Sequence, residues 1–523
     1  MKQKHKPNLM LQGTASSVGK SILTAAFCRI FKEDGYRVVP FKSQNMALNS
    51  YITETGLEMG RAQVFQAEAA GIKPLADMNP ILLKPTGEKS AQVIVRGKVL
   101  GNRSAMAYHQ MKPSLRETVR EAYEALEASA DVVLLEGAGS PAEINLQEHD
   151  LVNMGMADMV DAPVLLIGDI DRGGVFASLY GTLLLLPEDQ RHRVKGLLIN
   201  KFRGDLEILK PGLKQLEELT GLPVVGVIPY GDFDIEEEDG TAERLSYRPQ
   251  AAESNALQVA VIRLPRISNF TDFHWLEKLP GVELRYVQRP EEVGLPDMLI
   301  IPGTKNTLAD LAWLRHQGLD QMIWKVREQG GMVCGICGGF QMLGTWLHDP
   351  LQLESDHGSM PGLNLISAET VFESEKTTTQ ITGRVKWSSA VQVNGKHDQR
   401  SILSDGYEVK GYEIHMGQTM LSEGVAPFAQ LTDRSGGQRM DGGISADGKV
   451  WGTYLHGIFD NEDFVTALLK SLSKSGDSWD VKAMPSFDVY KEAQYDKLAA
   501  TVRNSVDMAA IYRMMNLSSG DKS

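Results

Sequence analysis

The amino-acid sequence predicts an α/β fold with two modules in series, each built on a parallel sheet. In the first module, short apolar runs alternate with segments of helical spacing, and four of these runs occupy residues 132–135, 164–167, 197–199 and 224–227. A second series of the same kind begins at Leu257. Short apolar strands that alternate with helices are typical of a parallel sheet covered on both faces.

The remaining elements follow in order along the chain. The first module adds strands at 8–12 and 36–41 and helices at 21–33 and 60–70. The second module has strands at 259–263, 283–287, 298–301 and 332–336, a turn-rich antiparallel stretch over 363–428, and a last strand at 450–455. A helix is expected over 491–515, with its methionines serving as packing residues.

These patterns divide the chain into four parts. We expect a phosphate-loop domain over 1–235, an acidic linker over 236–255, a second α/β domain over 256–474 and a helical tail over 475–523. The charge run at the start of the linker, from Asp232 to Arg244, is expected to be a solvated surface. A chain of 523 residues is long enough for several domains with substantial cores.

Composition limits the partners and the compartment. The formal net charge of −13 argues against nucleic acid and anionic membranes as partners, since both require a basic surface. Three cysteines, Cys28, Cys334 and Cys337, form no disulfide framework and are typical of a reducing cytosol. Since no apolar run has the length needed to span a bilayer, we expect a soluble, cytoplasmic protein.

A glycine-rich turn directly after the first strand indicates a phosphate-binding loop. In GTASSVGKS, from Gly13 to Ser21, backbone N–H groups and a helix N-terminus can bind phosphate. Lys20 would reach the terminal phosphates and Ser21 would hold Mg²⁺, with Gly19 completing the turn. The spacing departs from the common form, because Gly13 is one position early and Thr14 takes the usual glycine position.

This loop resembles the dethiobiotin synthetase-like branch of phosphate-loop enzymes, which holds both amide-forming ligases and partitioning ATPases. The resemblance implies that Glu136, in LLEGAGS, is a second Mg²⁺ ligand, although a strand-end acid can also cap a turn. Asp169 and Asp171 could approach metal or substrate or serve the turn alone, and Asn200 and Lys201 lie where related folds contact the nucleotide base.

A second reactive feature is the thiol of Cys337 in the segment Gly335–Gly339. A nucleophile between a strand and a helix, flanked by glycines, projects from a strained turn, and the helix N-terminus favours the thiolate. The N–H of Gly338 can stabilise an oxyanion, with a second donor at Gly303. The alternative is that Cys334 and Cys337 form a redox pair or half of a zinc site. A zinc site is disfavoured because the further ligands that it needs are missing.

The motif C-x-G-x-Q, with Gln341 as its last member, and the later WGTYLHGIF resemble the class I glutamine amidotransferase domain. The resemblance implies that Cys337 attacks the amide of glutamine, that His456 is the general base and acid, and that Gln341 helps bind glutamine. Many members carry Glu two residues after the His. Here Ile458 stands at that position, so either the pair of Cys337 and His456 works without such an acid or another acid such as Asp460 orients the imidazole.

Ten segments in order, from QGTASSVGKS to GTYLHGIFD, resemble the cobyric acid synthase family of cobalamin-biosynthesis amidotransferases. The resemblance implies ATP-, Mg²⁺- and glutamine-dependent amidation of four peripheral carboxylates of adenosylcobyrinic acid a,c-diamide, giving adenosylcobyric acid, with a sheltered route for ammonia between the sites. Cations must then surround the substrate, and the candidates are Lys42, Lys84, Lys89 and Arg96, each of which could equally be a surface charge. Gln44 and Asn45 could form hydrogen bonds with the substrate or order the ligands of the metal ion. His415 would line the glutaminase site without catalysing.

Three alternatives stay open at the level of the sequence. One is the sister enzyme that amidates the a and c carboxylates, and another is a cell-wall amidating complex, whose two activities sit on separate chains. The third is a partitioning-type ATP switch with a non-catalytic second domain, against which the presence of Cys337 and His456 argues. The oligomeric state and the order of amidations do not follow from the residues.

Overall fold

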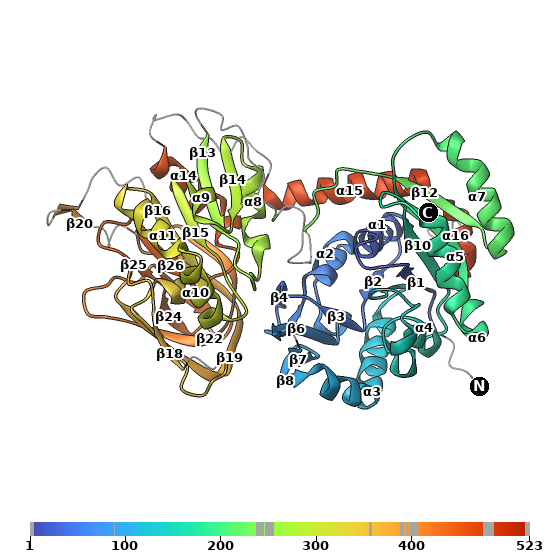
Figure 1. Ribbon diagram of the computed structural model, residues 1–523, viewed down its shortest axis with the longest axis horizontal. Helices are drawn as coiled ribbons and strands as arrows, with labels where there is room; N and C mark the ends of the chain where they lie inside the picture. The colour runs from blue at the N-terminus through green and yellow to red at the C-terminus, as the bar shows by residue number, and fades with distance from the viewer. Residues whose placement is uncertain are drawn as a thin grey trace.

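The computed structural model describes residues 5–87, 89–236, 245, 256–354, 358–387, 392–393, 396–397, 405–473 and 486–517. Figure 1 shows two lobes side by side, the N-terminal lobe in blue to green and the C-terminal lobe in yellow-green to orange. One red helix, α15 (Phe487–Ser505), runs between them. No helix in these described ranges is long and apolar enough to cross a membrane.

The N-terminal lobe is built on a six-stranded, wholly parallel sheet, as the sequence predicts. The strand order is β12 (Val224–Pro229), β11 (Val194–Phe202), β10 (Val164–Asp169), β1 (Asn8–Gly13), β9 (Val132–Glu136) and β2 (Val38–Phe41). Since β1 lies in the middle, the loop that follows it is at the centre of the carboxyl edge of the sheet, where ligands bind in this class of fold.

Successive residues of each strand face opposite helical layers. Leu9 and Leu11 of β1 pack in one core with the first two helices, whereas Met10 packs in the other core with the third. The helices of the lobe are α1 (Lys20–Glu33), α2 (Arg61–Ala70), α3 (Ala105–Ser129), α4 (Met154–Met159), α5 (Val175–Leu185), α6 (Glu188–Arg191) and α7 (Leu206–Thr220). Both faces of the sheet are therefore covered.

An insertion between β2 and α3 forms the side of this lobe that faces the other one. It holds the four-stranded sheet β3 (Gln44–Met46), β6 (Ile81–Gly87), β7 (Ser90–Val95) and β8 (Lys98–Ser104), and the hairpin β4 (Ser50–Ile52) and β5 (Glu58–Gly60). The sequence pattern does not predict this insertion, because its strands are short and only partly apolar.

The C-terminal lobe has a second, mainly parallel sheet. The order is β14 (Val282–Val287), β13 (Leu257–Ile262), β15 (Met298–Ile301), β16 (Met332–Ile336), β26 (Val450–Thr453) and β25 (Gly443–Ile444), with only β25 antiparallel. Its helices are α8 (His274–Lys278), α9 (Pro290–Val293), α10 (Thr307–His316), α11 (Leu319–Glu328), α12 (Gly338–Leu343) and α14 (Glu462–Leu472).

The turn-rich stretch predicted over 363–428 is mainly antiparallel, as expected, and it belongs to a sheet that is separate from the parallel one. It is dominated by the long antiparallel pair β19 (Ala368–Val385) and β22 (Glu408–Leu421), and β17 (Trp346–His348), β18 (Ser359–Pro361), β23 (Ala429–Asp433) and β24 (Gln438–Asp441) complete it. The hairpin β4–β5 of the N-terminal lobe packs on this pair, with Ile52 in one small core with Tyr412 and Ile414.

The chain end ties the lobes together. Phe487 of α15 packs on Trp275 of the C-terminal lobe, and farther along the helix Asp496 pairs with Arg29 of α1. The single helix expected over 491–515 is in fact two, α15 and α16 (Met508–Met514). Val506 leaves the helix and forms an antiparallel bridge with Gly226 of β12, so a tertiary contact interrupts the helical pattern.

Most of the stretch predicted as a linker lies outside the described residues. Its first residue, Glu236, is buried and paired with Arg61 at 2.5 Å, and Leu245 lies in the core of the C-terminal lobe. At Glu236 the charge run is packed, contrary to the expectation that it is solvated, and at Leu245 the linker is packed as well.

Candidate functional site

The loop after β1 places the predicted phosphate-binding residues around one turn. The backbone of Gly19 has φ 97°, and a Cβ there would lie 2.3 Å from Nδ2 of Asn200, so only glycine fits. Lys20 is buried, and its Nζ donates to the carbonyls of Ala15 at 2.7 Å and Gly139 at 3.0 Å. The loop thus folds around the ammonium that the sequence assigns to phosphate.

Glu136, at the end of β9, is the centre of a buried polar cluster beside this loop. Its Oε1 accepts from Ser21 Oγ at 2.7 Å and from Lys42 Nζ at 2.9 Å, and its Oε2 accepts from Gln66 Nε2 at 2.6 Å. Burial by itself raises the pKa of Glu136, but Lys42 and the hydrogen bonds from Ser21 and Gln66 hold that pKa below its usual value. The carboxylate is therefore ionised and fixed in place.

The two predicted metal ligands, Ser21 and Glu136, are thus adjacent. Nowhere in the described part of the chain do three or more His, Cys, Asp and Glu side chains gather into a metal-binding group. A hydroxyl and one carboxylate fit Mg²⁺, which keeps several waters and takes its remaining ligands from substrate phosphates. The donor set matches a nucleotide-bound ion rather than an all-protein metal cage.

Asn200 and Lys201 contact the backbone of the phosphate loop. Asn200 Nδ2 donates to the carbonyl of Val18 at 2.8 Å, and Lys201 Nζ donates to the carbonyl of Ser17 at 2.7 Å and to Asp169 at 2.8 Å. Asp171 lies 3.3 Å from Arg203. These residues brace the loop from the β11 side, and a contact with the nucleotide base stays a prediction.

The predicted substrate contacts separate into two groups. Lys42 is at the Glu136 cluster, Gln44 Oε1 accepts from Tyr108 at 2.5 Å, and Asn45 donates to Gln63 at 3.3 Å, all in the N-terminal lobe. Lys84 instead lines a cavity with Cys337. The remaining two are at the surface or paired, Lys89 being exposed and Arg96 bonded to Asp77.

Cys337 stands on a sharp turn between β16 and α12, as predicted. Its φ of 51° is positive, which is uncommon for a residue with a side chain and strains the backbone. The turn can close only with glycine at two positions. A Cβ at residue 339 would lie 1.9 Å from the carbonyl oxygen of Ile301, and a Cβ at residue 335 would lie 2.6 Å from the carbonyl oxygen of Gly339. Glycine at both positions lets the strand and helix meet and projects the thiol.

The other two cysteines are remote from this chemistry. Cys334 is fully buried within β16, and burial raises its pKa well above the usual value. Cys28 lies in α1 of the other lobe, with its pKa likewise raised by burial. Since Cys334 points into the core, this arrangement gives no support to the redox or zinc alternative.

His456 lies beside Cys337, and its partner is an acid that sequence reasoning missed. Nδ1 of His456 is 2.7 Å from Oδ2 of Asp272, whose Oδ1 also accepts from the N–H of Gly457 at 3.1 Å. Burial lowers the pKa of His456, but Asp272 and Cys337 raise it to about 10. The geometry is that of a nucleophile, a base and an orienting carboxylate.

Asp272 replaces the expected candidate, Asp460. The enclosed carboxyl of Asp460 has its pKa raised to about 8 by burial and by Asp272, and no described residue forms a hydrogen bond with its Oδ1. Ile458, at the position of the missing Glu, is fully buried in the core. Asp272 follows β13 in the segment 268–275, and the polar residues after that strand were the signal available in the sequence.

The remaining predicted thiol-site residues surround Cys337. Gly303 lies next to the imidazole of His456: a Cβ at residue 303 would be 3.2 Å from Cε1 of His456. Gly338 is the first residue of α12. Gln341 is buried between Thr307, at 2.9 Å, and Tyr454, at 3.1 Å. Gln341 and Gly338 line the cavity into which Cys337 and His456 open.

This cavity joins the two lobes and is rich in buried charge. Lys84 of β6 lines it together with Lys305, Lys376 and Glu354. Glu58, behind it, pairs with Lys84 at 3.0 Å and with Lys376 at 2.6 Å, and this ion pair crosses between the lobes. Burial lowers the pKa of Lys376 to about 8.

His415, predicted to line the site, does line this cavity. Burial lowers its pKa to about 4, so the ring is neutral and donates from Nδ1 to the carbonyl of Gly417 at 2.8 Å. It stacks on Tyr454 with ring centroids 3.8 Å apart. This arrangement suits a packing role, and the absence of a catalytic role for His415 stays a prediction.

Comparisons with known proteins cover both lobes. Residues 258–464 match the family described as CobB/CobQ-like glutamine amidotransferase domain, and residues 9–240 match the CobQ/CobB/MinD/ParA nucleotide binding domain. A cobyric acid synthase of Alkaliphilus metalliredigens (strain QYMF) is 55% identical, covering 97% of this chain and 99% of the relative. Cobyric acid synthases of Thermoanaerobacter sp. (strain X514) and Listeria monocytogenes serovar 1/2a (strain ATCC BAA-679 / EGD-e) are 54% and 50% identical, with 97% of this chain and 98% and 96% of each relative covered.

Proposed function

The chain belongs to the cobyric acid synthase family, and from this premise we propose that it amidates the four peripheral carboxylates of adenosylcobyrinic acid a,c-diamide, using ATP, Mg²⁺ and glutamine. It is a ligase of the glutamine amidotransferase type that acts in cobalamin biosynthesis, and its N-terminal lobe is a nucleotide-binding domain. The substrate, the product and the need for ATP, Mg²⁺ and glutamine are the proposed part.

One observation carries the proposal. The cavity that holds Cys337 and His456 is closed on one side by Lys84, a residue of the lobe that carries the phosphate loop. Ammonia released from glutamine would therefore form at the contact between the lobes instead of at an outer surface. Such a position suits an enzyme that passes ammonia to a carboxylate activated in the neighbouring lobe.

In the glutaminase half-reaction, Cys337 Sγ attacks the side-chain amide carbon of glutamine. His456 gives its proton to the departing nitrogen, and Asp272 holds the imidazole and stabilises its cationic form. The N–H groups of the turn at Gly338 and Gly303 stabilise the oxyanion. Water then hydrolyses the thioester, with His456 as base, and glutamate leaves.

Glutamine carries an α-carboxylate and an α-ammonium, and the same cavity holds lysines suited to the first and Glu354 suited to the second; of the lysines, Lys84 and Lys376 are paired with Glu58. Burial lowers the pKa of Lys305 there, and burial raises the pKa of Glu354 to about 7, an effect that Lys305 partly offsets. Glu354 is held by the backbone N–H of Thr307 at 2.6 Å. We expect Lys305 to bind the α-carboxylate and Glu354 the α-ammonium.

In the ligase half-reaction, a corrinoid carboxylate becomes an acyl phosphate that ammonia then attacks. Lys20 neutralises charge on the phosphoryl group in transfer, and Ser21 and Glu136 would hold Mg²⁺, which supplies further charge stabilisation when bound. Lys42 Nζ donates to Oε1 of Glu136, and the same ammonium can orient the substrate carboxylate that accepts the phosphoryl group.

Ammonia needs a sheltered route, since ammonium is not a nucleophile. Buried amide side chains extend from the phosphate-loop cluster toward the other lobe: Gln66 bonds Glu136, Gln63 bonds Gln66 at 3.4 Å, and Asn45 bonds Gln63 at 3.3 Å. Farther on, the backbone N–H of Ser50 donates to Asn269, which lines the thiol cavity. We propose that these polar groups border the route.

The test supplies ATP, Mg²⁺, glutamine and adenosylcobyrinic acid a,c-diamide and follows the mass of the corrinoid. Four successive exchanges of hydroxyl for amino groups are the expected result. A chain that leaves this substrate unchanged but amidates cobyrinic acid at the a and c positions would be the sister synthase. Turnover of ATP without any corrinoid product or glutamate release would overturn the proposal in favour of an ATP switch.

A further inference from the structure

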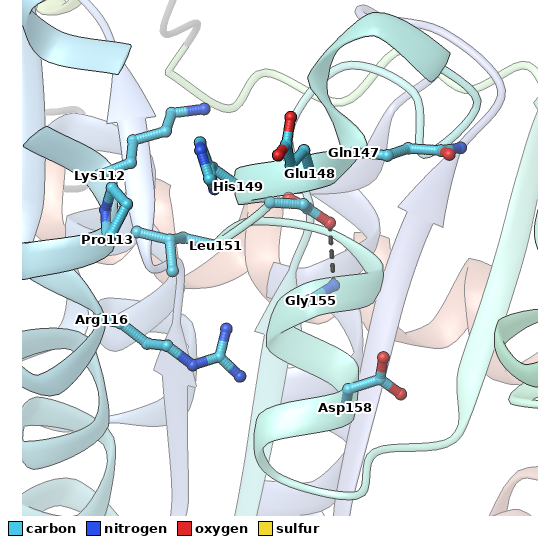
Figure 2. Close-up of a pocket in the computed structure, with 10 residues that line it drawn as sticks. Lys112, Pro113, Arg116, Gln147, Glu148, His149, Leu151, Gly155 and Asp158 are labelled. Atoms are coloured by element: carbon cyan, nitrogen blue, oxygen red, sulfur yellow. Dashed lines mark hydrogen bonds between the residues drawn. The ribbon is translucent and has the colours of Figure 1, made fainter. Parts of the chain in front are cut away.

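A cavity in the N-terminal lobe has no part in the two sites described above. It has a volume of about 250 Å³ and lies between α3 on one side and η2 (Ile144–His149) with α4 on the other. Figure 2 shows Lys112 and Arg116 projecting from α3 toward the side formed by His149 and α4.

Lys112 is the informative residue in its wall. Only 9% of Lys112 is exposed, and within the described ranges no hydrogen bond or ion pair joins its ammonium to another residue. Burial lowers the pKa of Lys112, and Asp150 only partly offsets this effect. A buried ammonium without a hydrogen-bonded partner is costly, and a bound anion would remove that cost.

The acids around the cavity are already engaged or turned to solvent. Asp150 accepts from the backbone N–H groups of Val152 at 2.8 Å, Asn153 at 3.0 Å and Gly155 at 2.9 Å. Asp158 pairs with Arg193 outside the cavity, and Glu148 is exposed. Since Arg116 also has no hydrogen bond or ion pair among the described residues, the wall offers two cations for an incoming anion.

Hydrogen bonds connect the cavity wall to the buried polar cluster around Glu136. The carbonyl of Leu151, which lines the cavity, accepts from Ser43 Oγ at 2.6 Å, and Ser43 follows Lys42, the partner of Glu136. In the same segment, Asn153 donates to the carbonyl of Ala138 at 2.7 Å, one residue before the Gly139 carbonyl that binds Lys20. The segment from Ala138 to Asn153 therefore contributes both to the wall of the cavity and to the surroundings of Lys20 and Glu136.

We propose that Lys112 and Arg116 form a carboxylate-binding subsite for a side arm of the corrinoid other than the one being amidated, an inference that rests on the proposed function. Binding a remote arm orients the macrocycle and directs one carboxylate to Glu136 and Lys20. Because an amide binds a cation less strongly than a carboxylate does, the subsite also distinguishes arms that are still acidic from arms already amidated.

The experiment compares the full-length wild type with Lys112→Met and Arg116→Gln. Equilibrium binding of adenosylcobyrinic acid a,c-diamide, followed by corrinoid absorbance, should weaken by about tenfold in each variant, as expected for loss of a charge-assisted hydrogen bond. KM for ATP and glutamine should stay unchanged. The order in which partly amidated corrinoids accumulate should also change, which a purely structural role would not cause.

Controls separate the possible failures. Lys214→Met, at a lysine whose side chain is 79% exposed on α7, should bind as the wild type does, and Lys112→Arg should retain most of the affinity. If Lys112→Met does not fold, the exposed Arg116→Gln decides. Corrinoid binding within twofold of wild type in Arg116→Gln and in any folded Lys112→Met overturns the subsite, and so does a shift confined to KM for ATP, which would assign the anion to the nucleotide. A wild type that neither binds nor amidates the corrinoid defeats the proposed function itself.

Discussion

The two reactive sites differ in how widely their residues are separated in the sequence. At the phosphate loop, Gly13 to Ser21 are contiguous, and strand ends at the same sheet edge supply Glu136 and Asn200. At the thiol, Asp272, Cys337 and His456 come from three separate segments of the C-terminal lobe, and Lys84 comes from the other lobe. A local motif identifies the first site, whereas only folding assembles the second.

The two sites also differ in the protonation states of their buried acids. Glu136 is surrounded by donors that keep it ionised. The thiol lobe instead mixes satisfied and unsatisfied acids, because Asp272 is bonded to His456 while Asp460 nearby is held protonated by burial. Two similar acids in one lobe therefore have opposite roles, and exchanging each of them is informative.

The largest effect is expected from removing the nucleophile. Cys337→Ala should lower glutamine-dependent amidation by at least about 10⁴-fold, since no other described thiol opens into the cavity, and ammonia-dependent amidation should survive. Glutamate release and corrinoid mass measure the two activities. Cys334→Ala is the matched control, and normal glutamine use by Cys337→Ala would remove Cys337 from the mechanism.

Removing the lysine of the phosphate loop should instead impair amidation and spare glutamine hydrolysis. Lys20→Ala should lower amidation by about 10³-fold with either glutamine or ammonia, because the phosphoryl charge loses its cation. Basal glutamine hydrolysis should persist, since Cys337 and His456 are untouched. Rates measured with both nitrogen sources test this, and amidation rescued by ammonia would show that Lys20 serves the glutaminase instead.

Asp272→Asn should lower glutamine hydrolysis by about 10³-fold while leaving ammonia-dependent amidation in place. Without the carboxylate that raises it, the pKa of His456 should fall from about 10, and the proton needed by the leaving nitrogen should be lost at lower pH. The pH profile of glutaminase activity measures the shift. An unchanged rate and profile would leave Asp272 with a structural role alone.

The proposed ammonia route predicts a smaller, selective effect. Gln63→Met should lower the amide formed per glutamine hydrolysed by about threefold to tenfold, because an apolar side chain replaces a buried polar group between the sites. Parallel assays of glutamate and amide give the ratio. Gln418→Met, at an exposed glutamine of β22, is the control, and equal ratios in the two variants would place the route elsewhere.

The smallest effect concerns stability and distinguishes Asp460 from Asp272. The folded chain holds the proton of Asp460 with a pKa of about 8, above the value of about 3.9 in an unfolded chain. Stability from this group is therefore full below about pH 4 and falls as the pH rises to about 8. Asp460→Asn should stabilise the protein by about 1–3 kcal/mol at pH 8 and by less at pH 5.

Thermal unfolding at the two pH values measures this difference, with glutaminase activity as a second readout. Activity should stay within about twofold of wild type, in contrast to Asp272→Asn. A loss of activity equal to that of Asp272→Asn would return Asp460 to the catalytic group.

Much of the fold follows from residue patterns alone. The strands of both parallel sheets are short apolar runs, and the structure confirms each run predicted in the first module to within a few residues. The hairpin at Ser50–Gly60 escapes the pattern because its strands are three residues each. The break at Val506 escapes it because a contact with Gly226 ends a segment that is helical by composition.

The sequence by itself determined the reactive groups: a thiol that glycines must surround, and a lysine and serine at the start of a helix after a strand. These are local requirements of backbone geometry, so neighbouring residues record them. Only the tertiary structure decided that Asp272 supports His456, that Lys84 closes the thiol cavity and that Lys112 is buried with no hydrogen-bonded partner among the described residues. Those relations depend on which segments pack together, and burial and distance, rather than residue type, set the charge state of each group.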